Sequence, residues 1–176
     1  MIWESAPWKN DLLRDADIIE RWAKKPTSTK GQTLLEKKIF VAAYAMRKLG
    51  EGGKLSDSLK TTALKVQSFP RTDSTLTPLN YHRFEKHFDL AAARPESMRV
   101  RVLLNEIIHS RIFVFSVDET ETTIGFLVCS GRNMNDRLLS VPLPDFISFM
   151  RRVGNNYPAD GRTWLDKNGK WQSWQE

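Results

Sequence analysis

The sequence has little cysteine, histidine, tyrosine or glycine: one, three, three and nine residues, respectively, out of 176. The single Cys129 excludes an intramolecular disulfide and a cysteine-based zinc site. His82 and His87 are five residues apart, so they lie on different faces of a helix and make a poor metal pair. We therefore expect neither a metal nor another cofactor.

The glycine-dependent and serine-dependent motifs of common enzymes are missing as well. Residues 50–53, Gly-Glu-Gly-Gly, follow an expected helix, whereas a phosphate-binding loop lies between a strand and a helix. No serine lies in a Gly-x-Ser-x-Gly elbow. Cys129 lies in an expected strand, where a small buried residue is a more natural interpretation than a nucleophile.

Long apolar stretches are also absent. No segment approaches the roughly 18 consecutive apolar residues of a membrane-spanning helix. The residues from Met1 to Ser5 lack the basic stretch and apolar core of a secretory signal. A single cysteine suits a reducing compartment. We expect a cytoplasmic protein without a membrane partner.

The composition is that of a basic globular domain. Lys and Arg number 27 against 21 Asp and Glu, which gives a net charge of +6. With 40% hydrophobic and 27% charged residues, the chain belongs among folded rather than disordered proteins. Its length predicts a single domain over residues 1–176.

The first part of the chain has the periodicity of helices. Apolar residues recur every three or four positions over 11–25 and 33–49, which predicts two long helices. Leu59, Ala63 and Val66 predict a short helix. A proline is tolerated in the first turn, so Pro95 predicts the start of a further helix that continues to about residue 110.

Between these helices, residues 68–78 are rich in Ser, Thr and Pro, and we expect a loop bounded by Pro70 and Pro78. Tyr81, Phe84 and Phe88 indicate another short helix after it.

Strand character begins after residue 110. Residues 112–117, 123–129 and 138–141 are rich in β-branched and aromatic side chains and are joined by short polar turns, which predicts a three-stranded antiparallel meander. A helix follows from Pro144 to Gly154, and together with the helix from about Thr33 it should cover the sheet.

The last segment, residues 156–176, contains Trp164, Trp171 and Trp174 around an Asn168-Gly169 pair. Asn-Gly is typical of a tight hairpin turn. We favour a small arm packed by its tryptophans, and a platform on which bases stack is the alternative. The fold class is therefore α+β. We divide it into a mainly helical part at about 10–110, a small sheet with a covering helix at 111–155, and a Trp-rich C-terminal arm.

One polar constellation could carry chemistry. Arg101, Asn105 and His109 are four residues apart and form one stripe along a helix. A histidine can act as general acid or base near neutral pH, and an arginine can bind a phosphate through two hydrogen bonds. An asparagine can orient either group. Metal-independent RNA cleavage, with the 2′-hydroxyl as nucleophile, requires groups of this kind.

The segment Asn105-Glu-Ile-Ile-His109, late in a helix, resembles the second half of the HEPN motif, although Leu104 stands where that family has its arginine. HEPN proteins are helical bundles, commonly dimeric, and many are ribonucleases of toxin–antitoxin and phage-defence systems. The resemblance therefore implies RNA as a partner, a homodimer as the assembly, and His109, Asn105 and Arg101 as catalytic residues.

Other interpretations of the stripe stay open. Asn105 and His109 could bond to each other in the core and fix the transition to the strand at Ile112. The protein could bind RNA without cleaving it. It could also be a non-enzymatic subunit whose sheet edge and arm bind a partner protein. The further binding candidates are Arg132, Arg151, Arg152, Trp164, Trp171 and Trp174.

Overall fold

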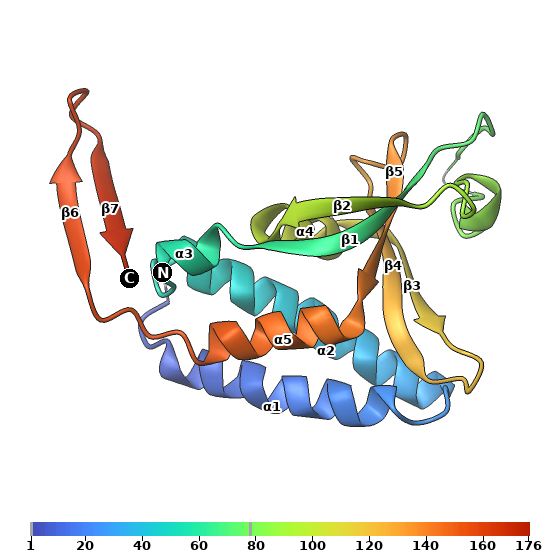
Figure 1. The fold of residues 1–176 in the computed structure, drawn as a ribbon, viewed down its shortest axis with the longest axis horizontal. Helices are drawn as coiled ribbons and strands as arrows, with labels where there is room; N and C mark the ends of the chain where they lie inside the picture. The colour runs from blue at the N-terminus through green and yellow to red at the C-terminus, as the bar shows by residue number, and fades with distance from the viewer. Residues whose placement is uncertain (1, 78) are drawn as a thin grey trace.

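The structure is a computed structural model that describes residues 2–77 and 79–176 (Figure 1). Met1 and Pro78 lie outside the described residues, and with Pro78 lies one end of the loop expected over residues 68–78. The helices are α1 (Ala6–Ala23), α2 (Thr29–Glu51), α3 (Asp57–Lys60), the 3-10 helix η1 (Phe84–Lys86), α4 (Val100–Ile108) and α5 (Leu143–Gly154). The strands are β1 (Ala63–Pro70), β2 (Arg94–Arg99), β3 (Ser110–Val117), β4 (Thr123–Ser130), β5 (Arg137–Pro142), β6 (Gly161–Leu165) and β7 (Trp171–Gln175).

Five strands form one antiparallel sheet in the order β2-β1-β5-β4-β3, and β6 pairs with β7 in a separate hairpin. The expected mixture of helices and antiparallel strands is confirmed. The three strands predicted after residue 110 are present as β3, β4 and β5. β1 and β2 are additional, so the sheet is wider than a three-stranded meander.

The helix predicted over residues 95–110 is wrong in its first part. Arg94–Arg99 is a strand paired with β1, and α4 begins only at Val100. Pro95, expected in the first turn of a helix, instead lies in β2, an edge strand of the sheet, opposite Gln67 of β1. An edge strand tolerates proline because the missing N–H can face away from its neighbour.

The short helix predicted from Leu59 to Val66 is also too long. α3 ends at Lys60, and Ala63 and Val66 belong to β1, which continues to Pro70 into the expected loop. Positions 59, 63 and 66 have helical spacing by coincidence. Val66 and Phe69 are the buried residues of β1, and they are buried because they pack within the sheet rather than along one face of a helix.

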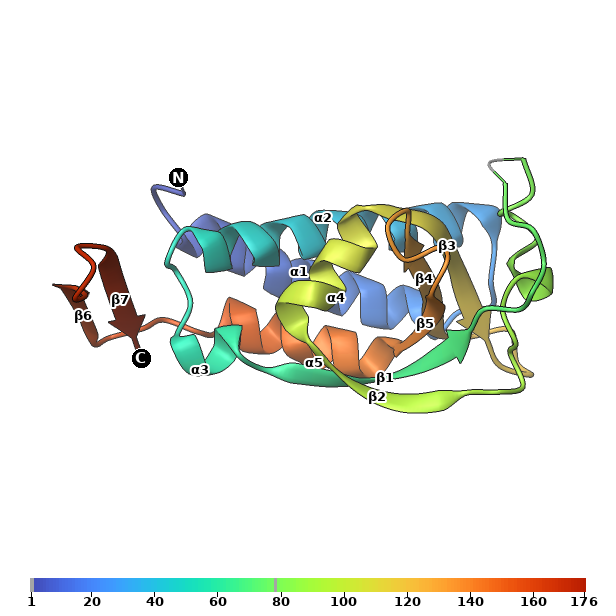
Figure 2. The same cartoon turned by 90° about the horizontal axis from the view of Figure 1, so that it is seen from above.

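Helices α4 and α5 pack against the inner face of the sheet (Figure 2). Phe126 of β4 meets Phe146 of α5 edge to face, with 5.6 Å between ring centroids. α2 reaches the sheet through Phe40, whose ring lies 4.9 Å from that of Phe113 in β3. α1 packs against α2 and α5 and completes the helical layer. The two helices expected to cover the sheet therefore both contact it, and α4 joins them.

The outer face of the sheet carries a second apolar cluster, to which the segment between β1 and β2 contributes. Its buried members are Phe69, Phe88, Ile112, Cys129 and Leu138. Burial raises the pKa of Cys129 to about 12, so this thiol is protonated at neutral pH. Cys129 is thus a small buried side chain, in agreement with the interpretation from the sequence.

In the described part of the segment between β1 and β2, the only helical turn is the short 3-10 helix η1, where a longer helix was predicted from Tyr81 to Phe88. His87, at the end of η1, is buried. Its Nδ1 lies 2.7 Å from the hydroxyl of Ser74 and its Nε2 lies 3.2 Å from the carbonyl oxygen of Asn80. Both ring nitrogens are therefore used to hold this segment together.

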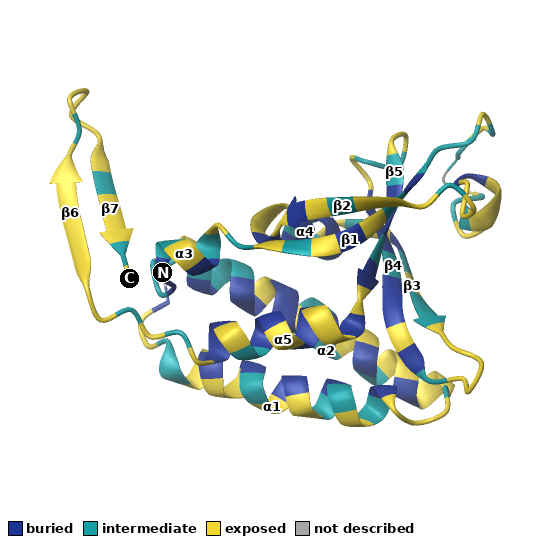
Figure 3. Cartoon of the chain, viewed as in Figure 1, coloured by how far each residue is buried: buried dark blue, intermediate teal, exposed yellow. Residues whose placement is uncertain are grey.

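The predicted C-terminal hairpin is confirmed as β6 and β7, but its tryptophans do not pack it against the body. The hairpin projects beyond α3 at one end of the molecule (Figure 1), and most of its residues are exposed (Figure 3). Trp164, Trp171 and Trp174 are 47%, 67% and 40% exposed. Over the described residues, none of the helices is long and apolar enough to cross a membrane.

Candidate functional site

The polar stripe predicted around Asn105 lies on α4, the short helix between β2 and β3. Four apolar residues of α4, Val100, Leu103, Leu104 and Ile107, are buried, and the helix packs against α2 and β4. Arg101 is exposed. His109 directly follows the last helical residue, and its backbone N–H donates to the carbonyl of Asn105 at 3.0 Å. The chain then turns into β3, and the imidazole of His109 stays exposed.

His109 lies beside an arginine from a distant part of the chain. Nη1 of Arg47, in α2, lies 3.4 Å from Nε2 of His109. A guanidinium can only donate hydrogen bonds, so Nε2 of His109 is the acceptor in this contact. When an anion takes over the guanidinium, the lone pair of Nε2 on the exposed imidazole becomes available, and the two side chains then have the arrangement of a general base beside an anion-binding group.

Glu51 holds Arg47 in this position. The Nε of Arg47 donates to one carboxylate oxygen of Glu51 at 2.8 Å, and Lys48 donates to the other at 2.8 Å. These hydrogen bonds, from Lys48 first and Arg47 second, lower the pKa of Glu51 to about 2. Glu51 thus stays charged and orients the guanidinium, which in turn contacts His109.

Asn105 and His109 are not a buried hydrogen-bonded pair. The side-chain partner of His109 is Arg47, and Oδ1 of Asn105 is buried without a hydrogen-bond partner among the described residues. The alternative in which the two side chains bond to each other inside the core does not hold, because the helix ends at Ile108 and His109 is exposed. A buried oxygen without a hydrogen-bond partner lowers the stability of the folded state by about 1–3 kcal/mol. The presence of Asn105 at this position therefore calls for an explanation other than stability.

Arg101 is too far along the helix to act on the same atoms as His109. Eight residues separate the two positions, which is about 12 Å along the axis of an α-helix. Arg47 therefore takes the place next to the histidine that sequence spacing assigned to Arg101. Nothing in the local sequence points to Arg47, because it lies 62 positions from His109.

Arg101 lines a groove that we call the basic groove, between the end of α2, α3 and the start of α4. Its volume is about 510 Å³. Its apolar lining includes Met46, Leu55, Leu59, Leu104 and Phe149. Its charged lining consists of Arg47, Glu51, Lys60, Arg99 and Arg101. Four cations thus meet one carboxylate, and an anionic ligand is favoured there.

Two of these cations have no acidic partner of their own. Lys60 pairs with Asp57 at 2.9 Å, and Arg47 pairs with Glu51. Among the described residues no ion pair joins Arg99 or Arg101 to a carboxylate. Their charge is therefore available to a ligand.

The other predicted arginines do not join the basic groove. Arg151 donates to Asp17 and Glu20, at 2.8 and 2.6 Å, so its charge is neutralised. Arg152 lines a different groove, together with Arg151, between α1 and α5. Arg132 is exposed in the turn after β4.

The predicted tryptophans lie on opposite faces of the hairpin. Trp174 pairs with Arg162, and Trp164 pairs with Gln172, so these four side chains share one face. Trp171 pairs with Leu165 and lies on the other face.

Comparison of this chain with models of protein families, with curated proteins and with solved structures gives no match in any of the three.

Proposed function

We propose that this protein binds RNA in the basic groove and cleaves it beside His109. The observation that carries the proposal is the contact of Arg47 with His109 at the side of a groove where four cations face one carboxylate. The resemblance of the Asn105–His109 segment to a motif of ribonucleases supports the same substrate.

The groove suits a chain of phosphates better than a single one. Arg99 and Arg101 lie at the start of α4, and Arg47 lies beside His109 at its end. About 12 Å of helix separates Arg101 from His109, so the two ends would contact different phosphates of one strand. Lys and Arg contacts of this kind position a nucleic acid without reading its sequence.

The proposed reaction needs only groups in this arrangement. A phosphate placed at Arg47 attracts the guanidinium more strongly than a neutral imidazole does, because the hydrogen bond to an anion is charge-assisted. Nε2 of His109 is then free to take the proton of a 2′-hydroxyl. The bond from O2′ to phosphorus forms, the bond from phosphorus to O5′ breaks, and the proton passes from His109 to O5′. The products are a 2′,3′-cyclic phosphate and a 5′-hydroxyl end.

The experiment is cleavage of a labelled single-stranded RNA by His109→Ala, with His82→Ala as the control because His82 is also exposed. Loss of a general base should lower the cleavage rate about 100-fold or more, while the dissociation constant stays within a few-fold. Equal cleavage by wild type and His109→Ala would overturn the catalytic part of the proposal.

Binding is tested separately by charge reversal in the groove. Arg101→Glu should weaken RNA binding, whereas Arg151→Glu, a change outside the groove, should have a smaller effect. Wild-type protein without measurable affinity for RNA at low salt would overturn the proposed function as a whole.

A further inference from the structure

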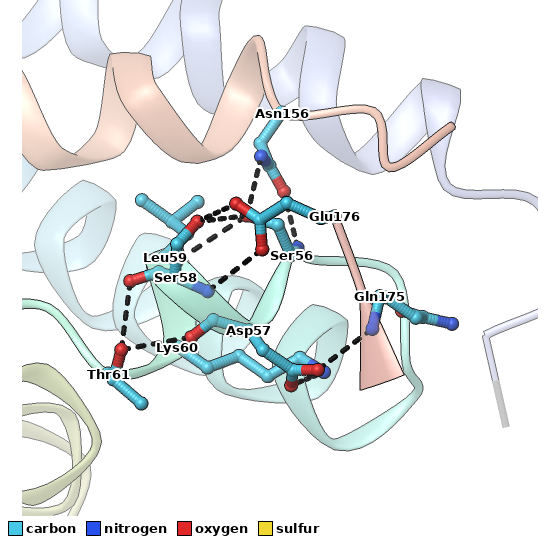
Figure 4. Close-up of polar contacts among 9 residues, drawn as sticks. All are labelled: Ser56, Asp57, Ser58, Leu59, Lys60, Thr61, Asn156, Gln175 and Glu176. Atoms are coloured by element: carbon cyan, nitrogen blue, oxygen red, sulfur yellow. Dashed lines mark hydrogen bonds and ion pairs between the residues drawn. The ribbon is translucent and has the colours of Figure 1, made fainter. Parts of the chain in front are cut away.

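The helix α3 connects the basic groove to the C-terminal hairpin. On one side, Leu59, Lys60 and Thr61 line the groove. On the other side, Asp57 accepts the backbone N–H of Gln175 at 2.8 Å, and the hydroxyl of Ser58 donates to Glu176 (Figure 4). The hairpin is thus anchored on α3, within a few residues of the groove.

The turn of the hairpin is fixed by one carboxylate. One oxygen of Asp166 accepts the backbone N–H groups of Asn168 and Lys170, both at 2.9 Å. The other oxygen accepts the side chain of Gln172 at 2.9 Å. These bonds, that of Lys170 first, lower the pKa of Asp166, so the carboxylate keeps its charge. Isolated two-stranded hairpins are marginally stable in water, and this network together with the anchor on α3 compensates for that.

One face of the hairpin combines aromatic rings with a cation. Trp164 and Trp174 occupy diagonal positions on this face, roughly 7–8 Å apart between Cα atoms. Arg162, directly opposite Trp174, lines the same shallow groove as the two indoles. Indole faces stack on nucleobases of any sequence, and an arginine beside them can contact a phosphate or stack itself.

We propose that Trp164 and Trp174 stack on bases of a single-stranded RNA whose backbone lies in the basic groove. This inference rests on the proposed function and adds to it the substrate class, because only unpaired bases can leave their stack and lie against an indole. The groove binds phosphates near His109, the strand passes over α3, and the hairpin holds the bases that follow.

The test uses labelled 2′-O-methyl-uridine oligomers, which lack the 2′ nucleophile and cannot be cleaved by the proposed step. A strand of about 4 nucleotides is short enough to occupy the groove alone, and one of about 12 can also reach the hairpin. Affinities are measured by fluorescence anisotropy at one fixed salt concentration. The variants are Trp164→Ala/Trp174→Ala and, as the matched control on the opposite face, Trp171→Ala.

We expect the double variant to bind the long strand about tenfold more weakly or worse, and to bind the short strand as the wild type does. Trp171→Ala should match the wild type with both strands. Trp164→Phe/Trp174→Phe should recover most of the affinity, because phenyl rings also stack. This recovery distinguishes stacking from a loss of hairpin structure.

Two results would overturn the stacking proposal while leaving the groove intact. One is equal affinity of wild type for both strands. The other is equal loss in the double variant and in Trp171→Ala. In both cases, weaker binding of both RNA strands by Arg101→Glu would show that the groove still binds RNA. The hairpin would then be a candidate binding site for a protein partner instead. Absence of binding by wild type to either strand would instead remove the proposed function together with this inference.

Discussion

Nη1 of Arg47 lies 3.4 Å from Nε2 of His109, and Nε of the same guanidinium donates to Glu51 at 2.8 Å. A single arginine thus connects the end of α2 to the end of α4. It can exchange its contact with the imidazole for a contact with a phosphate without losing its contact with Glu51.

Arg47→Ala should reduce RNA cleavage at saturating substrate by about 100-fold, because it removes a cation from the position where charge develops on the phosphate. Lys48→Ala is the matched control, since Lys48 also binds Glu51 but does not contact His109. The measurement is single-turnover cleavage of a labelled strand. If Lys48→Ala cleaves RNA as slowly as Arg47→Ala, the loss of rate comes from removing any positive charge at this end of α2 and not from the contact of Arg47 with His109.

Asn105→Leu should stabilise the fold. The variant replaces a buried oxygen that has no partner among the described residues with an apolar group of similar size, and this should raise the free energy of unfolding by about 1 kcal/mol. Asn133→Leu is the contrast, because Asn133 donates to the buried carboxylate of Glu106, and its loss should destabilise the fold. Thermal unfolding measures both changes. A lower melting temperature for Asn105→Leu would mean that its oxygen has a structural partner.

Much of the fold follows from local patterns in the sequence. The wide apolar stripe of α2 has the helical period, whereas the runs of β3 and β4 are short, rich in β-branched and aromatic residues and bounded by polar turns, which indicates strands. β2 was missed because its residues carry no apolar alternation, and Pro95 is tolerated equally at a helix start and on an edge strand. Only the pairing of β2 with β1, more than two dozen residues earlier in the chain, decides between the two.

The candidate site was only partly accessible from the sequence for a similar reason. The helical spacing predicts that Arg101, Asn105 and His109 lie on one side of the same helix. Arg101 and His109 are nevertheless eight positions apart, which is about 12 Å along the helix axis. Arg47 comes from another helix, and a contact between residues 62 positions apart leaves no local signal. The exposure of Trp164 was likewise decided by tertiary structure, because the hairpin contacts the body only near its base.

The salt dependence of RNA binding should report the cations of the groove. Each phosphate contact to a single strand contributes about 0.7 to the slope of log affinity against log salt concentration. Arg101→Ala should therefore lower that slope by about this amount. Arg151→Ala should leave it unchanged, because Asp17 and Glu20 already neutralise that guanidinium. Affinities at four or five salt concentrations suffice. Equal slopes for wild type and Arg101→Ala would place the RNA elsewhere on the surface.

Lys9 should make the stability of the protein rise with pH in the alkaline range. Its side chain is 1% exposed, Nζ donates to the carbonyls of Lys54 and Asn156, and it lies 4.0 Å from the ring centroid of Tyr157. Burial, and to a smaller extent the charge of Lys54, lowers the pKa of Lys9 below 10.5. Between the lowered pKa and 10.5 the unfolded chain binds more protons than the folded one, so unfolding becomes harder as pH increases.

The neutral amine still has two N–H groups for the two carbonyls, which is why loss of the proton does not break this contact. Lys9→Met removes both the titration and the hydrogen bonds. Urea unfolding of wild type and Lys9→Met from neutral pH toward 10.5 should therefore show a stability difference that grows with pH in favour of the wild type. Lys37→Met, a change at an exposed position of α2, is the control for the same substitution at the surface. A difference between wild type and Lys9→Met that stays constant or shrinks would mean that Lys9 keeps its proton in the folded state.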